Sequence, residues 1–247
     1  MASISICIPA YSMGGKGASY LSDSLEILTR QSFDDFEVIV SDQSSDTAVQ
    51  SVCDQFESRL SIRHVWNLEG KRQASANTNN AVNHAQGEVI KILFQDDYLG
   101  SEDVLKKTSE AFEKGGEWLL CGSGVSRDGI TIERPMVPRL TQKLRFGRNT
   151  VSSPSVLAMR RSGLELFDEE LIWLMDVDLY QRLWDRHGDP LILPETQVVN
   201  RIHDGQVSAS VTPELRRKEL LYMAEKAKGN FPLPARLEYW RQLLKAR

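Results

Sequence analysis

Apolar and polar positions follow two different periods along the first hundred residues. Short apolar runs that are rich in β-branched residues and bounded by turn-forming residues predict buried strands, whereas leucines three or four positions apart predict amphipathic helices. The expected strands are residues 3–9, 36–40, 63–66 and 89–94, and the expected helices are residues 19–30, 46–56 and 74–85. This alternation predicts an α/β fold with a largely parallel sheet, helices on both faces and right-handed crossovers.

The pattern is less regular after residue 100. Further strands are expected at residues 118–122, 151–159 and 198–203, and a helix at residues 176–187. Residues 127–140 predict a loop or hairpin, because Asp128-Gly129 is a good turn signal. The stretch from residue 213 to residue 247 predicts two helices, separated by a Gly-Asn-Phe-Pro break at residues 229–232.

Two adjacent carboxylates, Asp96 and Asp97, follow the fourth predicted strand directly. They must emerge at the carboxyl edge of the sheet, because burying them in the core has a large desolvation cost. Open α/β sheets bind their ligands at that edge. Two hard oxygen donors there suit Mg²⁺ or Mn²⁺ shared with substrate phosphates. The alternative is the N-terminus of a helix, since Ser101-Glu102-Asp103 follows shortly and acids favour that position.

Composition is that of an ordinary soluble protein, with 41% hydrophobic and 26% charged residues. No apolar run is long enough to span a bilayer, and the first one ends too early for a signal peptide. The three cysteines lie far apart without metal-ligand spacing, which indicates a reducing compartment, so we expect a cytoplasmic protein. From Val211 onward nine basic residues face four acidic ones, while the whole chain has a net charge of −4. The acidic main body excludes general nucleic-acid binding.

Five segments stand in order along the chain: SISICIPAY, QSFDDFEVIVSDQSSD, AVNHAQGEVIKILFQDDYL, SPSVLAMRRSGLELFDEELIWLMDVDLYQRL and RIHDGQVS. Taken together, with this order and spacing, they resemble the glycosyltransferase family 2 enzymes of the GT-A fold. The resemblance implies a GT-A-type single domain with a mostly parallel, Rossmann-like sheet over residues 1–210. Residues 1–99 would be the nucleotide-sugar-binding half and residues 100–210 the acceptor-binding half. Residues 211–247 would form a basic helical tail.

The resemblance also implies an activity: an inverting, metal-dependent transfer of a sugar from a UDP- or dTDP-sugar to an acceptor hydroxyl, with Mn²⁺ or Mg²⁺ as cofactor. Asp42 matches the family position that reads the pyrimidine base, although Asp42 and Ser44 could merely form an Asx turn. Asp96 would contact the ribose and Asp97 the metal. The remaining positions implied for donor or metal binding are Pro9, Tyr11, Lys71, Asn79 and His203.

The acceptor side is implied by the segment around Asp176. Asp176 matches the carboxylate that removes a proton from the acceptor hydroxyl, and the alternative is that it caps its helix. Ser155 and Trp173 are expected to line the acceptor site, where an aromatic ring can stack on a sugar. The acceptor would be a glycan or a lipid-linked sugar, as in polysaccharide biosynthesis. Two family aspartates are replaced here, by Ser41 and by Phe94.

Three further interpretations stay open. A sugar-phosphate nucleotidylyltransferase shares the α/β plan, but Gly14-Gly15-Lys16-Gly17 imitates its phosphate loop only loosely and does not match a P-loop. A non-catalytic nucleotide-sugar or glycan-binding module is the second. The third concerns the tail, where Leu237, Trp240 and Leu244 form an apolar stripe beside basic residues. This stripe either docks on its own domain or contacts the inner face of an anionic membrane peripherally.

Overall fold

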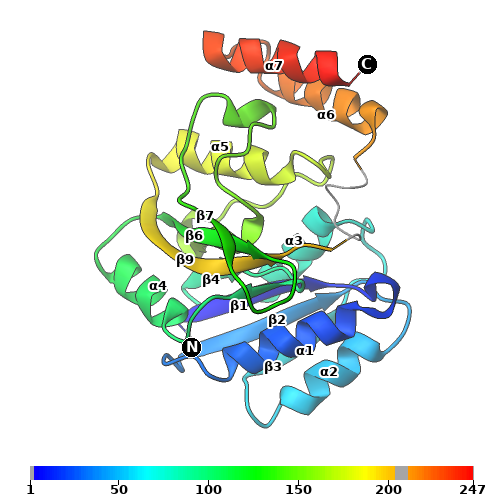
Figure 1. The fold of residues 1–247 in the computed structure, drawn as a ribbon, viewed down its shortest axis with the longest axis vertical. Coiled ribbons are helices and arrows are strands. Elements are labelled where there is room, and N and C mark those ends of the chain that lie inside the picture. Colours follow the sequence, from blue (N-terminus) through cyan, green and yellow to red (C-terminus); the bar gives the residue numbers. More distant parts are fainter. Residues whose placement is uncertain (1–2, 204–210, 247) are drawn as a thin grey trace.

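The structure is a computed structural model that describes residues 3–203 and 211–246. Predictions that fall on residues 204–210 and 247, including the part of RIHDGQVS that follows His203, lie outside the described residues. The description below therefore covers the sheet, the helices packed on it and the two tail helices (Figure 1).

The first half of the chain forms a parallel sheet. Its strands are β1 (Ile4–Ala10), β2 (Phe36–Asp42), β3 (Ile62–Trp66) and β4 (Val89–Ile92), in the spatial order β3-β2-β1-β4. All three pairings between them are parallel. Every residue of β1 and β4 is buried, which explains their nearly continuous apolar sequences. Here the predicted strands are confirmed.

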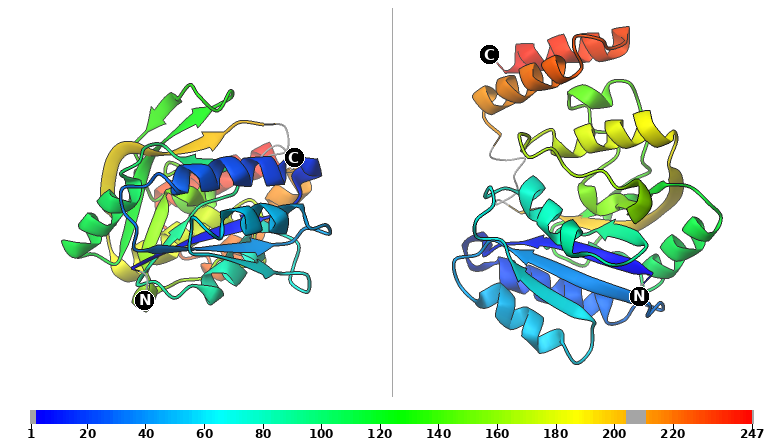
Figure 2. Two further views of the ribbon diagram at one scale, coloured as in Figure 1. Left: turned by 90° about the horizontal axis from the view of Figure 1, so that it is seen from below. Right: turned by 180° about the vertical axis from the view of Figure 1, so that it is seen from behind.

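Three helices cover this parallel sheet: α1 (Gly17–Leu28), α2 (Ala48–Phe56) and α3 (Ala74–His84). Right-handed crossovers place α1 and α2 side by side on one face and α3 on the other, because the strand order reverses between β3 and β4 (Figure 2). The carboxyl ends of β1 and β4 therefore flank a topological switch point, where α/β sheets bind ligands.

The second half continues the same sheet in the order β4-β8-β6-β9-β5. These strands are β8 (Leu157–Arg160), β6 (Trp118–Ser126), β9 (Leu191–Arg201) and β5 (Asp97–Leu99). β8 runs antiparallel to both neighbours, β6 and β9 are parallel, and β7 (Glu133–Met136) forms the expected hairpin with β6. The predicted α/β class, with a curled sheet between helices, is confirmed (Figures 1 and 2).

Four elements differ from the predictions. β5 and α4 (Val104–Glu113) were not expected, because β5 has only three residues and lies in a polar segment. β9 begins at Leu191, well before the predicted residue 198. The strand expected at residues 151–159 begins only at Leu157, since Pro154 starts a short 3₁₀ turn over Pro154–Val156. Both β5 and α4 follow the acid pair, and the residue at the N-cap of α4 is Asp103. Neither Asp96 nor Asp97 therefore lies at the N-terminus of that helix.

The remaining helices stack at one end of the molecule. They are α5 (Met175–His187), α6 (Pro213–Lys226) and α7 (Leu233–Lys245), with α7 outermost in Figure 1. The ring of Phe146 contacts those of Phe231 and Tyr239, with centroids 4.8 and 5.1 Å apart, so the tail packs on the domain. Within residues 3–203 and 211–246, no helix is long and apolar enough to cross a membrane.

Candidate active site

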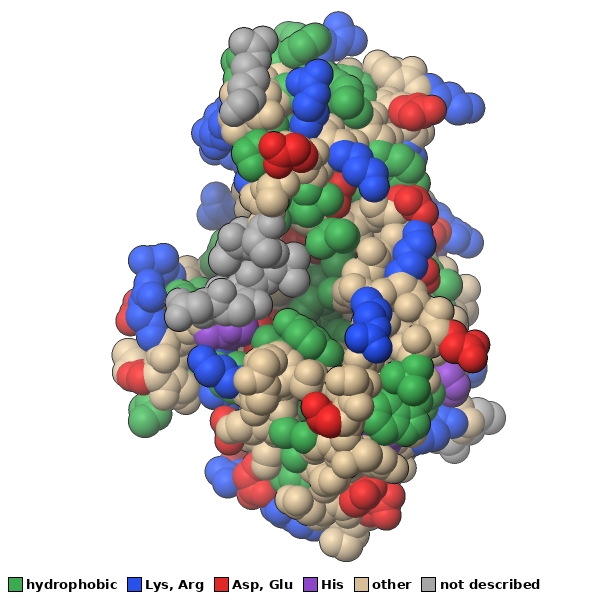
Figure 3. Space-filling model, turned by 90° about the vertical axis from the view of Figure 1, so that its right-hand side faces the viewer, with side chains coloured by type: hydrophobic (Ala, Val, Ile, Leu, Met, Phe, Trp, Pro, Cys, Tyr) green, Lys and Arg blue, Asp and Glu red, His purple; other side chains and the backbone are tan. Residues whose placement is uncertain are grey.

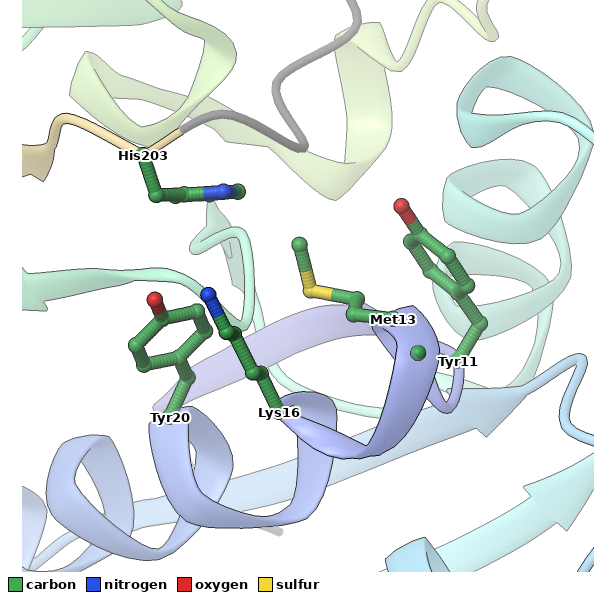
Figure 4. Close-up of a pocket in the computed structure, with 6 residues that line it drawn as sticks. Tyr11, Met13, Lys16, Tyr20 and His203 are labelled. Carbon is green, nitrogen blue, oxygen red and sulfur yellow. The ribbon is translucent and has the colours of Figure 1, made fainter.

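A pocket opens where β1 ends and α1 begins, on one side of the switch point. Its lining residues are Tyr11, Met13, Gly14, Lys16, Tyr20 and His203. Figure 4 shows Lys16 and Met13 pointing from the α1 side toward His203, which approaches from the opposite wall. The pocket therefore joins the first strand to a residue that lies almost 200 positions later in the sequence.

The loop that forms this pocket is fixed by Gln95, the residue just before the acid pair. Its side-chain amide accepts a hydrogen bond from the Tyr11 N–H (2.5 Å) and donates one to the Tyr11 carbonyl (3.0 Å). Gly17 begins α1 directly beneath, and a Cβ atom there would lie 2.0 Å from the Tyr11 carbonyl oxygen. Only glycine permits this close approach. Tyr11 itself stays 44% exposed beside the pocket.

Asp96 and His203 are brought together at this pocket. The His203 Nε2 atom lies 2.9 Å from Asp96 Oδ2, and the two side chains keep 8% and 18% of their surface exposed. The His203 ring also packs on Tyr20, with centroids 5.3 Å apart. A carboxylate oxygen and an imidazole nitrogen are both suitable donors to a divalent metal. Within the described residues, no third Asp, Glu, His or Cys joins them.

Asp97 lies on the other side of the backbone, inside the protein. Its Oδ2 atom accepts hydrogen bonds from Ser155 Oγ (2.5 Å), Asn200 Nδ2 (2.8 Å) and Ser153 Oγ (3.0 Å). Burial, with a contribution from the Asp96 charge, raises the pKa of Asp97 to about 7 against these hydrogen bonds. Asp97 is therefore buried, whereas Asp96 is partly exposed and contacts His203, which lines the pocket.

Asp42 is completely buried at the end of β2. Its Oδ1 atom accepts the Ser44 N–H at 2.8 Å, which is the Asx turn considered from the sequence, and its Oδ2 atom lies 3.0 Å from His64 Nε2. Pro9 is buried in β1, where it pairs with Ser41 in register. Both residues therefore shape the floor under the pocket loop.

Lys71 and Asn79 both contact the segment that precedes α5. Lys71 Nζ lies 2.5 Å from Glu170 Oε1 and 3.1 Å from the Glu169 carbonyl, and the hydrogen bond to Glu170 raises the pKa of Lys71. Asn79 is buried, donates to the Phe167 carbonyl (2.9 Å) and accepts the Phe167 N–H (2.8 Å). These contacts make Asn79 a structural tie between α3 and the segment that precedes α5.

Asp176 begins α5 and is only partly accessible. Its Oδ2 atom accepts a hydrogen bond from Asn149 Nδ2 (2.6 Å), and its Oδ1 atom accepts the Val177 N–H (2.7 Å). Burial raises the pKa of Asp176 to about 7, against these hydrogen bonds and with a small contribution from Glu219. A carboxylate with a pKa near neutrality can take up a proton at the pH at which it works. The nearby Asp178 is instead paired with Arg182 and Lys226.

Ser155 and Trp173, the predicted acceptor residues, have mainly internal contacts. Ser155 is fully buried, where its hydroxyl bonds Asp97 and also accepts the Phe94 N–H at 2.9 Å. The Trp173 ring is covered by the Arg216 guanidinium, 4.2 Å above its centroid. Ser155 therefore donates a hydrogen bond to Asp97 inside the protein, and its buried hydroxyl cannot contact an acceptor in this structure.

The family model described as glycosyl transferase family 2 matches residues 5–167, more than half of the chain. The chain belongs to this family. The predicted family is thereby confirmed.

Curated relatives of this family 2 protein are glycosyltransferases. It is 31% identical over 99 residues to Glycosyltransferase GlyG of Streptococcus pneumoniae, an alignment that covers 39% of this chain and 31% of GlyG. It is 27% identical over 197 residues to a Campylobacter jejuni enzyme named GalNAc(5)-diNAcBac-PP-undecaprenol beta-1,3-glucosyltransferase, covering 73% of this chain and 60% of that one. The chain thus spans less than two thirds of these relatives.

Solved structures agree with the fold. S. aureus TarS 1–349 in complex with UDP-GlcNAc superposes with a TM-score of 0.73 at 19% identity, covering 99% of this chain and 72% of that one. The Pyrobaculum calidifontis mannosyltransferase PcManGT, in complex with GDP-Man and Mn²⁺, gives 0.68 at 17% identity, covering 99% and 72%. At these identities the likeness shows the fold of the family 2 domain.

Sequence reasoning missed four residues of this family 2 site: Lys16, Gln95, Asn149 and Glu219. Lys16 belongs to the segment that was dismissed as a P-loop, yet its side chain lines the pocket. Asn149 had no motif to mark it. Glu219 comes from the tail, and its carboxylate accepts the N–H groups of Ile172, Trp173 and Leu174 at 2.8 to 3.2 Å, at the N-terminus of α5. The acidic residues of the tail gave no signal for this long-range capping.

Proposed function

We propose that this family 2 protein is a metal-dependent glycosyltransferase that moves a sugar from a UDP- or dTDP-sugar to an acceptor hydroxyl, with inversion by direct displacement. The observation that carries the proposal is the pairing of two different acid sites in one domain. Asp96 and His203 meet at the pocket beside the switch point. Asp176, with its pKa raised to about 7, stands at the start of α5.

One segment of chain, residues 149–155, connects the two sites. Asn149 binds Asp176 at 2.6 Å, while Ser153 and Ser155 bind Asp97, the neighbour of Asp96. Ser152 between them has a φ angle of 110°, a conformation that is strained for any residue except glycine. Strain held by surrounding hydrogen bonds is common at functional sites, so this segment supports a coordinated role for the two acids.

Donor binding is assigned to the pocket. Tyr11 offers an exposed ring for stacking on the base, and Lys16 brings a cation to the wall opposite His203, where it can neutralise phosphate charge (Figure 4). Asp42 is retained as the predicted base contact; since its side chain is fully buried, the contact requires its loop to open. TarS, whose complexes contain UDP-GlcNAc and UDP, shares the fold and supports a nucleotide-sugar donor.

We assign the metal to Asp96 and His203 rather than to Asp97. Mg²⁺ and Mn²⁺ accept one or two protein donors and fill their other positions with water and substrate phosphates, so the pair Asp96 and His203 suffices for such a site. When bound, the cation supplies Lewis acidity for the departing diphosphate. Asp97 then serves as the buried anchor that fixes the backbone of its neighbour.

Asp176 is assigned as the general base. In its charged form it accepts the proton of the acceptor hydroxyl while that oxygen attacks the anomeric carbon from the face opposite the leaving diphosphate. Asn149 and the Val177 N–H orient its two oxygens, which fixes the direction of proton transfer. The acceptor is proposed to be a glycan or a lipid-linked sugar, in keeping with the undecaprenol-linked substrate in the name of the Campylobacter relative.

A thermal-shift screen of nucleotide sugars, with and without Mn²⁺, tests the donor and the metal together, because a ligand that binds the folded state raises the melting temperature. We expect a uridine or thymidine diphosphate sugar to stabilise the protein only with metal, and Asp96→Asn to remove this effect. Transfer should stop in chelator and should fall steeply in Asp176→Asn. Undiminished transfer in both conditions would refute the proposal.

Two alternatives have distinct outcomes in the same assays. A nucleotidylyltransferase would release pyrophosphate from a nucleoside triphosphate, and the family membership disfavours it. A non-catalytic binding module would bind UDP tightly without turnover on a broad panel of acceptors. The replacements at Ser41 and Phe94 were the reason to consider such a module. In the structure the Ser41 hydroxyl is satisfied by Asn77 and Asn80, a purely structural role.

A further inference from the structure

The outermost helix, α7, has its apolar side facing outward. Four large hydrophobic side chains are exposed on it: Leu233 (65%), Leu237 (61%), Trp240 (58%) and Leu244 (60%). Their spacing of four, three and four residues places them on one stripe along the helix. We call these four residues the outer stripe of α7.

The inward side of α7 is unusually polar. Glu238 and Gln242 are 3% and 6% exposed, between Ala235 and Ala246. Gln242 donates to Glu238 at 2.8 Å and accepts a hydrogen bond from Arg216 of α6 at 3.2 Å. Leu237, Trp240 and Leu244 are each more than half exposed. The stripe therefore does not dock on its own domain, which was one of the two alternatives that the sequence left open.

The charges around the outer stripe are all positive. Arg236 lies on one flank, and Arg241 and Lys245 lie on the other, with all three exposed. Glu238 is the single acid of α7, and it is buried with a 3.3 Å contact to Arg241. Figure 3 shows green hydrophobic and blue basic side chains sharing the end of the molecule that α6 and α7 form.

We propose that the outer stripe of α7 docks on the surface of an anionic lipid bilayer. A helix with one apolar stripe flanked by cations lies in the plane of the interface, with its leucines at the acyl boundary and its basic groups at lipid phosphates. Tryptophan suits this depth because its ring is apolar and its N–H is polar. This inference rests on the proposed function for one point only: the surface would present a lipid-linked acceptor to the site.

A second copy of the chain fits the outer stripe less well. A twofold contact between two α7 helices would bring their cationic flanks together, and α7 itself has no exposed acid to offset them. Stable protein interfaces also bury about 20–30 residues on each side, far more than one stripe supplies. A membrane needs no matching surface and attracts the cations that a dimer would repel.

Sedimentation with vesicles tests the proposal. The full chain is mixed, without nucleotide sugar, with vesicles of phosphatidylglycerol and phosphatidylcholine, or of phosphatidylcholine alone. We expect binding to the anionic vesicles and little to the neutral ones. A stripe variant (Leu237→Ser, Trp240→Ser, Leu244→Ser) should bind at least about tenfold more weakly. A charge variant (Arg236→Gln, Lys245→Gln) should also bind more weakly, and salt should weaken the unaltered chain.

The matched control is Ile130→Ser, which removes a residue that is 85% exposed on the β6–β7 hairpin, and which should bind like the unaltered chain. Melting temperatures of all variants should stay unchanged, since the replaced side chains are exposed. Failure to bind anionic vesicles, equal binding by the stripe variant, or a dimer that the stripe variant abolishes would each overturn the inference. Sugar transfer to a water-soluble acceptor should persist in the stripe variant, so failure of docking is distinguishable from failure of the proposed function.

Discussion

At the scale of single residues, the carboxylates of the site differ in what surrounds them. Asp96 contacts His203 and keeps some exposure, whereas Asp97 is enclosed by Ser153, Ser155 and Asn200. Beneath it, the ammonium of the buried Lys91 donates to the Ser155 carbonyl, and burial lowers the pKa of Lys91. These neighbours in sequence therefore have different surroundings, because Asp96 lies in the turn that follows β4 and Asp97 begins β5.

Replacement of Asp96 and replacement of Asp97 should have different effects, one on metal binding and the other on stability. Asp96→Asn should abolish the metal-dependent rise in melting temperature and leave the stability without ligand nearly unchanged. Asp97→Ala should lower the free energy of unfolding by about 1–3 kcal/mol, because three buried donors lose their acceptor. Denaturant unfolding and thermal shift with Mn²⁺ measure the two effects. The opposite pattern, with metal dependence lost only in Asp97→Ala, would return the metal to Asp97.

Asp176→Asn should lower kcat by about 10²- to 10⁴-fold without weakening donor binding, since the base acts on the acceptor. In the unaltered protein the base is active only when deprotonated. Its pKa is raised to about 7, so kcat should rise as pH increases through 7 and level off above it. A pH profile of kcat measured in saturating donor checks this. A flat profile between pH 5 and 9, a range chosen about the raised pKa, would contradict it.

At the scale of elements, α5 depends on a tail helix for its N-terminus. The residue before α5, Leu174, has no side-chain capping hydrogen bond of its own. Glu219 of α6 instead accepts the N–H groups of Ile172, Trp173 and Leu174, the three residues that lead directly into α5. Negative charge at a helix N-terminus is stabilising, and this carboxylate is buried against it. The tail therefore positions the helix that carries the candidate base.

Glu219→Gln tests this positioning role. We expect the free energy of unfolding to fall by about 1–2 kcal/mol, from the loss of a charged cap. Because the Glu219 charge helps to raise the pKa of Asp176, its removal should also move the midpoint of the kcat–pH profile to lower pH. Glu225→Gln, an exposed acid on the same helix, is the matched control. A purely structural cap would change stability and leave the midpoint where it was.

The sequence predicted correctly the elements in which the hydrophobic pattern of a strand or helix is repeated over several residues. The fully buried strands β1 and β4 and the helices with leucines on one face were evident from the residues alone. β5 could not be predicted, because it exists only by pairing with β9: Asp97 lies opposite Asn200. For the same reason the separation of Asp96 from Asp97, the Asn149 contact and the Glu219 cap were invisible, since each joins residues distant in sequence.

At the scale of the whole molecule, the family model and the candidate site do not have the same extent. The match ends at residue 167, while Asp176, His203 and Glu219 all follow it. The proposed base, the proposed second metal donor and the residue that supports the start of α5 thus belong to the less regular part of the chain. The resemblance of motifs identified Asp176 and His203, but no motif marked Glu219.

A chain shortened to residues 1–210 should therefore be impaired even though it retains the matched family region. We expect a lower melting temperature and a loss of transfer, because α5 loses its cap and the Phe146 ring loses Phe231 and Tyr239. Calorimetry and a transfer assay measure these effects. The stripe variant of α7 serves as the control, since it alters the tail without removing it. Full activity in the shortened chain would show that α5 is held by the domain alone.

The pairing of β5 with β9 also orders the events of folding. Asp96 stands between β4 and β5, and His203 just beyond the end of β9, so their meeting requires closure of a loop of about a hundred residues. Contacts of such long range form slowly and late. A nascent chain would complete its pocket only after nearly the entire sheet had been synthesised. A cation bound by these two side chains would then stabilise that long-range closure. Its release would destabilise β5 and β9, the strands that pair last, before the rest of the sheet.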